Sequence, residues 1–89
     1  MAEKSYVIID EAGIHARPAT LLVNTANNFK SDVKLEYKGK SANLKSIMGL
    51  MSLAVAKGGE VKVTATGSDD AEVIEAITNI MKEYRLING

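Results

Sequence analysis

The sequence predicts a small α+β domain with two layers, in which helices cover one face of a sheet. Three observations predict it. Segments with the alternation of β-strands and segments with helical spacing follow one another in the order βαββαβα. Two of the helical segments are long and amphipathic, and the strands are half polar, so the apolar surfaces pair as two layers. The 89 residues suffice for one domain, which we expect to span residues 1–89. The same order also fits a ferredoxin-like split βαβ arrangement with an added helix.

The first half of the chain is expected to form three strands and one helix. Ser5 to Ile9 is rich in β-forming residues and apolar on both faces, which predicts an inner strand of the sheet. An apolar pattern with helical spacing then predicts a helix from about Ala16 to Asn27. Residues 33–37 alternate between apolar and polar, which is typical of a half-buried strand. A Lys-Gly hairpin turn follows, and it leads into a short, lysine-bearing edge strand at residues 40–44.

The second half is expected to form a short helix, a strand and a long helix. Ser46 to Leu53 is short, apolar and rich in methionine, with Ser46 placed to cap a brief helix. Residues 61–66 alternate and predict a fourth strand. Asp69 and Glu72 have the spacing of a capping box at the start of the last helix. The apolar stripe of that helix consists of Val73, Ile74, Ile77, Ile80, Met81 and Tyr84.

Composition limits the classes of function. The chain has no cysteine, which excludes disulfides and thiolate metal clusters as sources of stability. Its eleven basic and eleven acidic residues give zero formal net charge, which argues against non-specific binding to nucleic acid. The N-terminal residues do not resemble a signal peptide, and no apolar run approaches the ~20 residues of a membrane span. We therefore expect a cytoplasmic protein that does not insert into membranes.

The stretch from Gly13 to Thr20 holds the only histidine and the only proline of the chain. A proline in the first helical turn loses no hydrogen bond, so Pro18 marks the start of a helix. His15 and Arg17 then lie at the positive end of the helix dipole, beside amides that the helix cannot satisfy. An imidazole is a nucleophile near neutral pH, and a guanidinium neutralises phosphate oxygens. The stretch therefore predicts a histidine that accepts and releases a phosphoryl group.

The same residues also have a plainer interpretation. His15 fits a partly exposed loop residue, and Arg17 fits a surface charge. Pro18 is needed for the helix start whatever His15 does. Two kinds of site find no support. A chain with one histidine and no cysteine has too few ligands for zinc, so no metal site is expected. No second histidine or nearby acid–base partner in the sequence supports a hydrolytic triad, although Asp10 and Glu11 lie close along the chain.

Two segments resemble signature motifs of a known family. GIHARPAT at residues 13–20 is similar to the active-site signature of HPr, the histidine-containing phosphocarrier family of the bacterial phosphoenolpyruvate:sugar phosphotransferase system. NLKSIMGLMSL at residues 43–53 resembles the regulatory serine region of Gram-positive members. The chain length and the order of elements fit as well, so the resemblance covers essentially the whole sequence. It implies an open-faced β-sandwich with a four-stranded antiparallel sheet and three helices on one face.

The resemblance also implies a phosphoryl carrier rather than an enzyme. His15 would accept a phosphoryl group from Enzyme I, which takes it from phosphoenolpyruvate, and pass it to sugar-specific transport domains. Arg17 would hold the phosphoryl oxygens, Pro18 would fix the helix start, and Ala16 would help to present backbone N–H groups. No cofactor is implied. A docking face shared by all partners favours a monomer.

Ser46 has two interpretations. On its own, a serine at a helix start is a cap worth ~1 kcal/mol. The resemblance implies in addition that an ATP-dependent enzyme, HPr kinase/phosphorylase, phosphorylates Ser46 and that a catabolite control transcription regulator binds the protein. A phosphate is favoured at a helix N-terminus, so the modification need not change the fold.

The short helix after Ser46 carries more apolar residues than one face can bury. The plainer interpretation places most of them in the core, and we expect this for Leu50 and Leu53. Methionines are adaptable contact residues at surfaces that serve several partners. The resemblance implies that Ile47, Met48 and Met51, together with Thr20, form a docking surface beside the histidine.

Two residues depart from the family pattern. Ala12 replaces a hydroxyl residue that is often found there, and Ala54 stands where many relatives have glycine. We expect fine tuning from both, because His15, Arg17 and Ser46 are kept. A regulatory relative of the family lacks the histidine, so the presence of His15 favours the carrier itself.

Two other functions are compatible with parts of the sequence. A regulatory binding module would act mainly through phosphoserine at Ser46, and this role can coexist with the carrier role in one chain. An RNA-binding split βαβ domain would need aromatic side chains displayed on the sheet and a basic face. The chain offers only four aromatic residues, Tyr6, Phe29, Tyr37 and Tyr84. Because Phe29 and Tyr84 already belong to the apolar stripes of helices, the RNA-binding alternative finds little support in the sequence.

Overall fold

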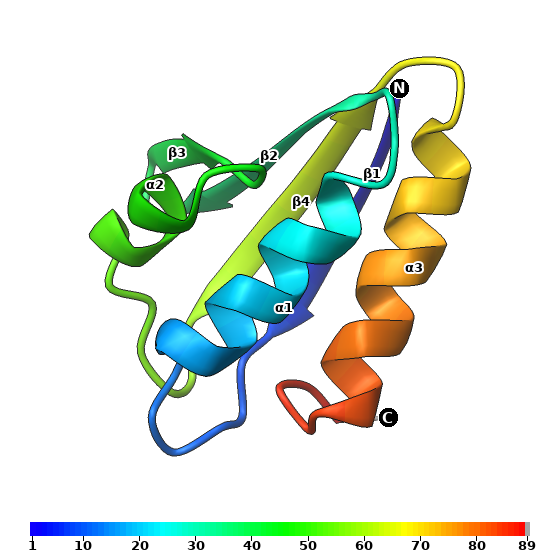
Figure 1. Cartoon of the computed structure of the whole chain (residues 1–89). Helices are drawn as coiled ribbons and strands as arrows, with labels where there is room; N and C mark the ends of the chain where they lie inside the picture. The colour runs from blue at the N-terminus through cyan, green and yellow to red at the C-terminus, as the bar shows by residue number, and fades with distance from the viewer. Residues whose placement is uncertain (89) are drawn as a thin grey trace.

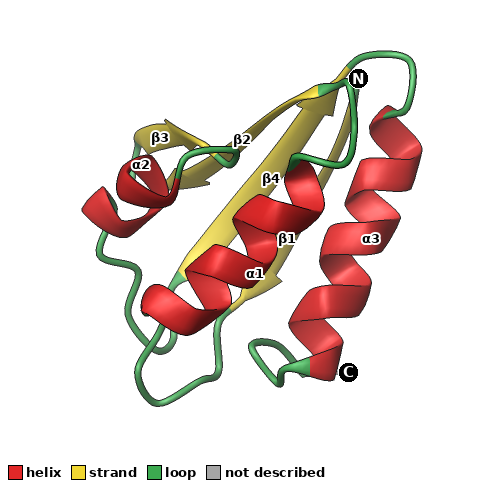
Figure 2. Ribbon diagram, in the orientation of Figure 1, coloured by secondary structure: helices red, strands yellow, loops and turns green. Residues whose placement is uncertain are grey.

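The seven predicted elements are all present in the computed structural model, which describes residues 1–88. They are β1 (Ala2–Val7), α1 (Ala16–Ala26), β2 (Asp32–Tyr37), β3 (Lys40–Asn43), α2 (Ile47–Ser52), β4 (Glu60–Thr66) and α3 (Asp70–Glu83). The sheet has the strand order β1-β4-β2-β3, and each neighbouring pair is antiparallel. All three helices lie on one face of the sheet (Figure 1), and the ribbon coloured by secondary structure shows the two layers (Figure 2). This arrangement confirms the predicted open-faced sandwich.

β1 lies at an edge of the sheet, so the inner strand predicted for Ser5 to Ile9 is wrong. In the sheet β1 has one neighbour, β4. The side chains of Tyr6 and Ile8 are buried, whereas Val7 is 52% exposed and Ile9 is 38% exposed. β-branched residues favour an extended backbone whether or not a second strand covers them. An apolar pattern on both faces therefore did not require two partner strands. β3 forms the opposite edge, as predicted.

The apolar faces of the sheet and the helices meet in one core. In β2 every second side chain is buried, and β4 has the same alternation, as predicted. Among the largest fully buried helical side chains are Leu22, Leu50, Ile77 and Met81. Tyr84, expected in the buried stripe of the last helix, is instead 42% exposed, because α3 ends there and Tyr84 is its C-cap residue.

The C-terminal tail folds back over the end of α3. Arg85 has a left-handed backbone (φ 57°), and its N–H donates to the carbonyl of Lys82 at 3.2 Å. The N–H of Leu86 donates to the carbonyl of Met81 at 2.8 Å, which completes a Schellman motif. Both Leu86 and Met81 are buried. The carbonyl of Leu86 then accepts a hydrogen bond from the N–H of Ile9 at 2.7 Å, so the tail is tied to the segment that follows β1.

Asp69 precedes α3 as predicted, but the capping box does not form. Asp69 is the N-cap residue, yet its side chain makes no capping hydrogen bond to the first turn, residues 70–73. Its carboxylate instead accepts hydrogen bonds from the amides of Lys30 (2.9 Å) and Ser31 (3.0 Å) and from the hydroxyl of Ser31. Ser31 is buried, and buried donors need an acceptor, whereas water can satisfy an exposed helix start. The bond from the Ser31 hydroxyl contributes most to a lowered pKa of Asp69, and the two amide bonds lower this pKa further.

Replacing Asp69 with asparagine is expected to reduce the loss of unfolding free energy that occurs when the pH becomes acid. The pKa of Asp69 is lower in the folded state than the unfolded value of about 3.9, so ionised Asp69 stabilises the fold above that value. This stabilisation is lost as the pH falls through the folded pKa. Urea unfolding measured from neutral to strongly acid pH should show a smaller loss for Asp69→Asn than for the wild type. Glu72→Gln, at an exposed carboxylate in the same helical turn, is the control and should follow the wild-type curve. Identical curves for all three proteins would contradict the assignment.

Ala54 follows α2 with a backbone conformation that favours glycine. Its φ is 51°, and its N–H donates to the carbonyl of Met51 at 3.1 Å. A side chain in this region costs about 1–2 kcal/mol, which is partly offset by the larger entropy of glycine in the unfolded chain. Ala54→Gly is therefore expected to raise the free energy of unfolding by ~0.5–1 kcal/mol in urea titrations. Ala56→Gly, at an exposed residue outside the left-handed region, should not stabilise. If Ala54→Gly gives no gain over this control, the strain assigned to Ala54 is absent.

Candidate functional site

His15 is the N-cap residue of α1. Its backbone is extended (φ −95°, ψ −173°), and its carbonyl accepts a hydrogen bond from the N–H of Ala19 at 3.0 Å. The earlier helical amides, those of Ala16 and Arg17, have no carbonyl four residues back inside the helix. Pro18 is buried in the first turn, as predicted, and has no N–H to offer. His15 thus lies at the positive end of the helix dipole, beside two backbone N–H groups that have no acceptor within the helix.

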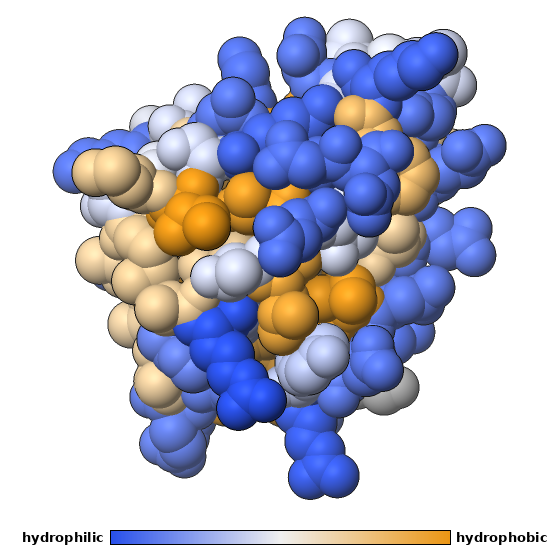
Figure 3. Space-filling model, viewed as in Figure 1, coloured by the Kyte–Doolittle hydropathy of each residue, from blue (hydrophilic) through white to orange (hydrophobic). Residues whose placement is uncertain are grey.

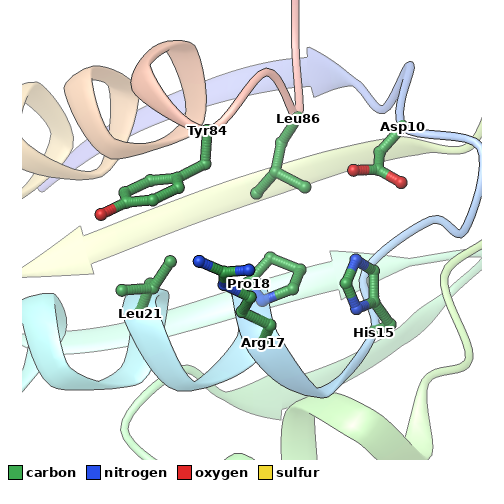
Figure 4. A pocket seen from close by; sticks show the side chains of 7 residues that line it. All are labelled: Asp10, His15, Arg17, Pro18, Leu21, Tyr84 and Leu86. Carbon is green, nitrogen blue, oxygen red and sulfur yellow. The ribbon is translucent and has the colours of Figure 1, made fainter.

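A surface pocket of about 280 Å³ opens beside His15 (Figure 4). Its walls come from α1, from the loop before α1 and from the C-terminal tail. The lining residues are Asp10, His15, Arg17, Pro18, Leu21, Tyr84 and Leu86. In Figure 4 the imidazole of His15 and the carboxylate of Asp10 extend toward the same end of the pocket from opposite walls. His15 is half-buried and Arg17 is exposed, so an imidazole and a guanidinium are both accessible at a helix start.

Gly13 fixes the approach of the chain to His15. Its φ is 65°, and a Cβ at this position would lie 2.1 Å from the carbonyl oxygen of Val55. That carbonyl accepts a hydrogen bond from the N–H of Ile14 at 3.0 Å. Only glycine allows this close approach, because any side chain would displace the backbone of the neighbouring loop. The loop after α2 therefore holds the residue that immediately precedes His15.

Ser46 is the N-cap residue of α2, as predicted. Its hydroxyl oxygen accepts a hydrogen bond from the N–H of Gly49 at 3.1 Å. The side chain is half-buried, so its hydroxyl lies close to solvent at the start of the helix. The capping role is confirmed, and the position is one where added negative charge is tolerated by the helix dipole.

The apolar side chains of α2 divide between the core and the surface. Leu50 is buried and Leu53 is half-buried against the core, as expected. Ile47 is 40%, Met48 85% and Met51 37% exposed, and we call these three residues the α2 patch. The space-filling view shows apolar side chains over α2 and along its junction with α1 (Figure 3).

Thr20, which is expected at the docking surface, is exposed on α1. Its hydroxyl donates a hydrogen bond to the carbonyl of Ala16 at 2.9 Å, which occupies its proton within the helix. The methyl group and an oxygen lone pair are left for a partner. α1 and α2 pack against each other, so the α2 patch, Thr20 and the start of α1 belong to the helical face of the molecule (Figure 1).

Comparison with known proteins identifies the family. A family model described as "PTS HPr component phosphorylation site" matches residues 2–83. The chain belongs to the HPr phosphocarrier family. HPr proteins are phosphocarriers of the phosphotransferase system and take part in sugar transport.

Solved structures agree with the assignment to HPr. The histidine-containing phosphocarrier protein of Mycoplasma is 40% identical, with a TM-score of 0.97 over 99% of this chain and 100% of that chain. HPr from Bacillus anthracis is 42% identical, with a TM-score of 0.82 over 89% of this chain and 94% of that chain. Crh, a catabolite repression protein of Bacillus subtilis described as a domain-swapped dimer, is 47% identical, with a TM-score of 0.73 over 93% and 95% of the two chains.

Four residues of this pocket, Asp10, Leu21, Tyr84 and Leu86, were not placed there by the sequence alone. Asp10 is close to His15 along the chain, but the sequence does not show that it faces the histidine, and Leu21 follows from the next turn of α1. Tyr84 and Leu86 come from the far end of the chain and complete the wall opposite α1. The signal for them was the apolar Leu86-Ile87 pair, which is more apolar than a chain end needs to be and is buried here.

Other features of the protein bear on membranes, metals and RNA. No helix within residues 1–88 has the length and apolar character needed to cross a membrane. Over the same residues, no three histidine, aspartate or glutamate side chains are grouped as metal ligands would be. The sheet aromatics Tyr6 and Tyr37 are 5% and 6% exposed, so they offer no platform for stacked bases. This argues against the RNA-binding alternative.

Proposed function

We propose that this member of the family carries a phosphoryl group on His15, which it accepts from Enzyme I and passes to sugar-specific transport domains. The observation that supports it most is the position of His15 at the N-cap of α1, in one pocket with Arg17. In this proposal residues 1–89 act as a single HPr-like domain in the cytoplasm. The protein is a stoichiometric carrier rather than an enzyme, because its partners complete the transition state.

The proposed chemistry is the transfer of a phosphoryl group to a nitrogen atom. A ring nitrogen of His15 attacks the phosphorus of the phosphorylated donor with its lone pair. The new P–N bond forms as the bond between phosphorus and the donor atom breaks, and the donor atom keeps the electron pair. Arg17 and the leftover amides of Ala16 and Arg17 stabilise the phosphoryl oxygens, while Pro18 holds the first turn of α1. Release to an acceptor reverses these steps with the acceptor as nucleophile.

Labelling with phosphoenolpyruvate tests the proposal. Incubation of the chain with phosphoenolpyruvate and Enzyme I should add one phosphate per chain, labile in acid and stable in base, as phosphohistidine is. Mass spectrometry of base-stabilised peptides should place it on His15. A chain that stays unlabelled, or that carries an acid-stable phosphate on another residue, would contradict the proposal.

We also propose regulation at Ser46. HPr kinase/phosphorylase would phosphorylate Ser46, and the product would bind a catabolite control transcription regulator. The half-buried N-cap position supports this, because a phosphate is favourable at a helix N-terminus and adds charge next to the α2 patch. Crh, a relative whose name refers to catabolite repression, is consistent with such a role. We propose a monomer as the working state, although Crh is described as a swapped dimer.

The α2 patch and Thr20 are proposed as the docking surface for phosphoryl donor and acceptors. Met48→Lys is expected to slow phosphoryl transfer from Enzyme I about tenfold without changing stability, because a charge at the centre of an apolar contact must be desolvated. Transfer rates from quenched-flow labelling, compared with urea unfolding, measure both effects. Val7→Lys, at an exposed apolar residue of the edge strand β1, is the matched control and should transfer normally. Wild-type rates for Met48→Lys would exclude Met48 from the docking surface.

A further inference from the structure

Asp10 places a negative charge in the pocket that receives the phosphoryl group. It lines the same pocket as His15 and Arg17, and its carboxylate extends toward the end of the pocket where the imidazole lies (Figure 4). Of the residues that line this pocket, Asp10 is the one carboxylate. A residue of this charge is unexpected at an anion site, because it opposes the ligand that Arg17 attracts.

Local hydrogen bonds explain why the Asp10 side chain has this orientation. One carboxylate oxygen, Oδ1, accepts a hydrogen bond from the N–H of Ala12 at 2.8 Å, and the Asp10 carbonyl accepts one from the N–H of Gly13 at 2.9 Å. The first bond closes an Asx turn and the second closes a β-turn, and both turns begin at Asp10. The second carboxylate oxygen accepts no hydrogen bond in the Asx turn. Because Asp10 lines the pocket, the carboxylate contributes a negative charge there. The Asx turn thus fixes the half-buried Asp10 three residues after the end of β1 and five residues before His15.

The neighbouring acidic residue is arranged differently. The carboxylate of Glu11 is paired with the ammonium group of Lys57 at 2.7 Å, and its side chain is 87% exposed. Among residues 1–88, Asp10 forms no ion pair within 4.0 Å. The charge of Asp10 is therefore not cancelled by a lysine or arginine contact, whereas Glu11 is paired with Lys57 and does not line the pocket.

We propose that Asp10 raises the phosphoryl-transfer potential of His15 by repelling the phosphoryl group bound there. The inference rests on the proposed carrier function and deepens it. A phosphoryl group carries about −1.5 to −2 charges at neutral pH. Arg17 and the helix start stabilise this charge, and a carrier stabilised by them alone would hold the group too tightly to pass it on. The carboxylate offsets part of that stabilisation. When the group leaves, the P–N bond breaks, the imidazole keeps the electron pair, and the repulsion is relieved.

An exchange equilibrium measures this effect directly. Phosphorylated wild-type protein, labelled with ¹⁵N, is mixed with unlabelled Asp10→Asn and a catalytic amount of Enzyme I, which equilibrates the phosphoryl group between the two. Mass spectrometry then gives the phosphorylated fraction of each. We expect the equilibrium to favour Asp10→Asn about three- to tenfold, the size of one partly solvated charge interaction with a group of double charge. Asparagine keeps the Asx turn, because its amide oxygen can accept the same bond from Ala12.

Glu11→Gln is the matched control, because it removes the same charge from the adjacent residue without touching the pocket. Its exchange constant should lie near one. Added salt gives a second, independent measurement, since the Debye length falls from ~30 Å at about 0.01 M to ~3 Å at about 1 M. The preference for Asp10→Asn should shrink accordingly. Equal constants for the two variants, or a constant that favours the wild type, would overturn the inference.

The inference and the carrier function can fail separately. If Enzyme I labels His15 but the Asp10→Asn constant matches that of Glu11→Gln, the carrier function stands and the role of Asp10 is wrong. If Enzyme I does not label the chain, phosphoramidate can load the imidazole chemically, with ammonia as the leaving group. Asp10→Asn should then hydrolyse about two- to fivefold more slowly than Glu11→Gln, because less repulsion is relieved as the P–N bond breaks. Equal half-lives in that experiment would overturn the inference.

Discussion

Replacing Gly13 with alanine is expected to lower the free energy of unfolding by ~2–5 kcal/mol. The left-handed backbone at Gly13 costs a residue with a side chain about 1–2 kcal/mol. The new Cβ would also lie 2.1 Å from the carbonyl oxygen of Val55, and this carbonyl cannot retreat without losing its hydrogen bond to the N–H of Ile14. Overpacking of this kind costs a further ~1–3 kcal/mol.

Gly39→Ala separates the two contributions. Gly39 also has a left-handed backbone (φ 79°), but nothing lies within 4 Å of a Cβ built there. It should therefore show the backbone cost alone. Thermal unfolding measures the difference, since 1 kcal/mol corresponds to about 4–8 °C in a domain of this size. If the two variants melt at the same temperature, the contact between Gly13 and the loop after α2 does not restrain the chain before His15.

Features that depend on neighbours in the sequence were predictable. Burial of one face leaves a period in the sequence, so the alternation of Val33, Leu35 and Tyr37 identified β2. The cap at Ser46 needs only the amide of Gly49, three residues later. The N-cap and first turn of α1 bring His15, Arg17 and Pro18 together within four residues, and local chemistry alone suggested an anion site there.

Features that depend on distant residues were not predictable in the same way. Asp69 was expected to bond within its own helix, but its partners Lys30 and Ser31 lie 39 and 38 residues earlier. No periodicity encodes that pairing, because it arises when the start of α3 packs beside the loop after α1. The edge position of β1 has the same origin, since strand order depends on the topology of the whole chain.

The pocket combines both kinds of feature. One wall is the local motif at the start of α1, and it was predicted. The other wall exists because the tail turns back at Arg85 and Leu86 bonds to Ile9. A left-handed arginine has no strong sequence signature, since glycine is the usual residue at that position. The sequence therefore identified the histidine at the helix start but not the residues that surround it in the pocket.

Ser46→Asp is expected to lower the efficiency of phosphoryl transfer from Enzyme I to His15 about ten- to hundredfold. The carboxylate would lie at the start of α2, next to the exposed Ile47 and Met48. Docking on the α2 patch would then require desolvation of a charge, or its approach to acidic groups of the partner, and a cost of about 1.4–2.7 kcal/mol corresponds to the expected effect. Aspartate is itself a good N-cap residue, so the free energy of unfolding should stay close to that of the wild type.

Ser46→Ala distinguishes the added charge from the lost hydroxyl. Alanine removes the hydrogen bond to Gly49 and should cost ~1 kcal/mol of stability, but it adds no charge and should transfer at nearly the wild-type rate. Steady-state transfer with limiting Enzyme I, together with urea unfolding, measures both quantities for each variant. If Ser46→Asp transfers as fast as the wild type, charge at Ser46 does not regulate the carrier. If both variants are equally slow, the N-cap geometry of α2, rather than charge, controls docking.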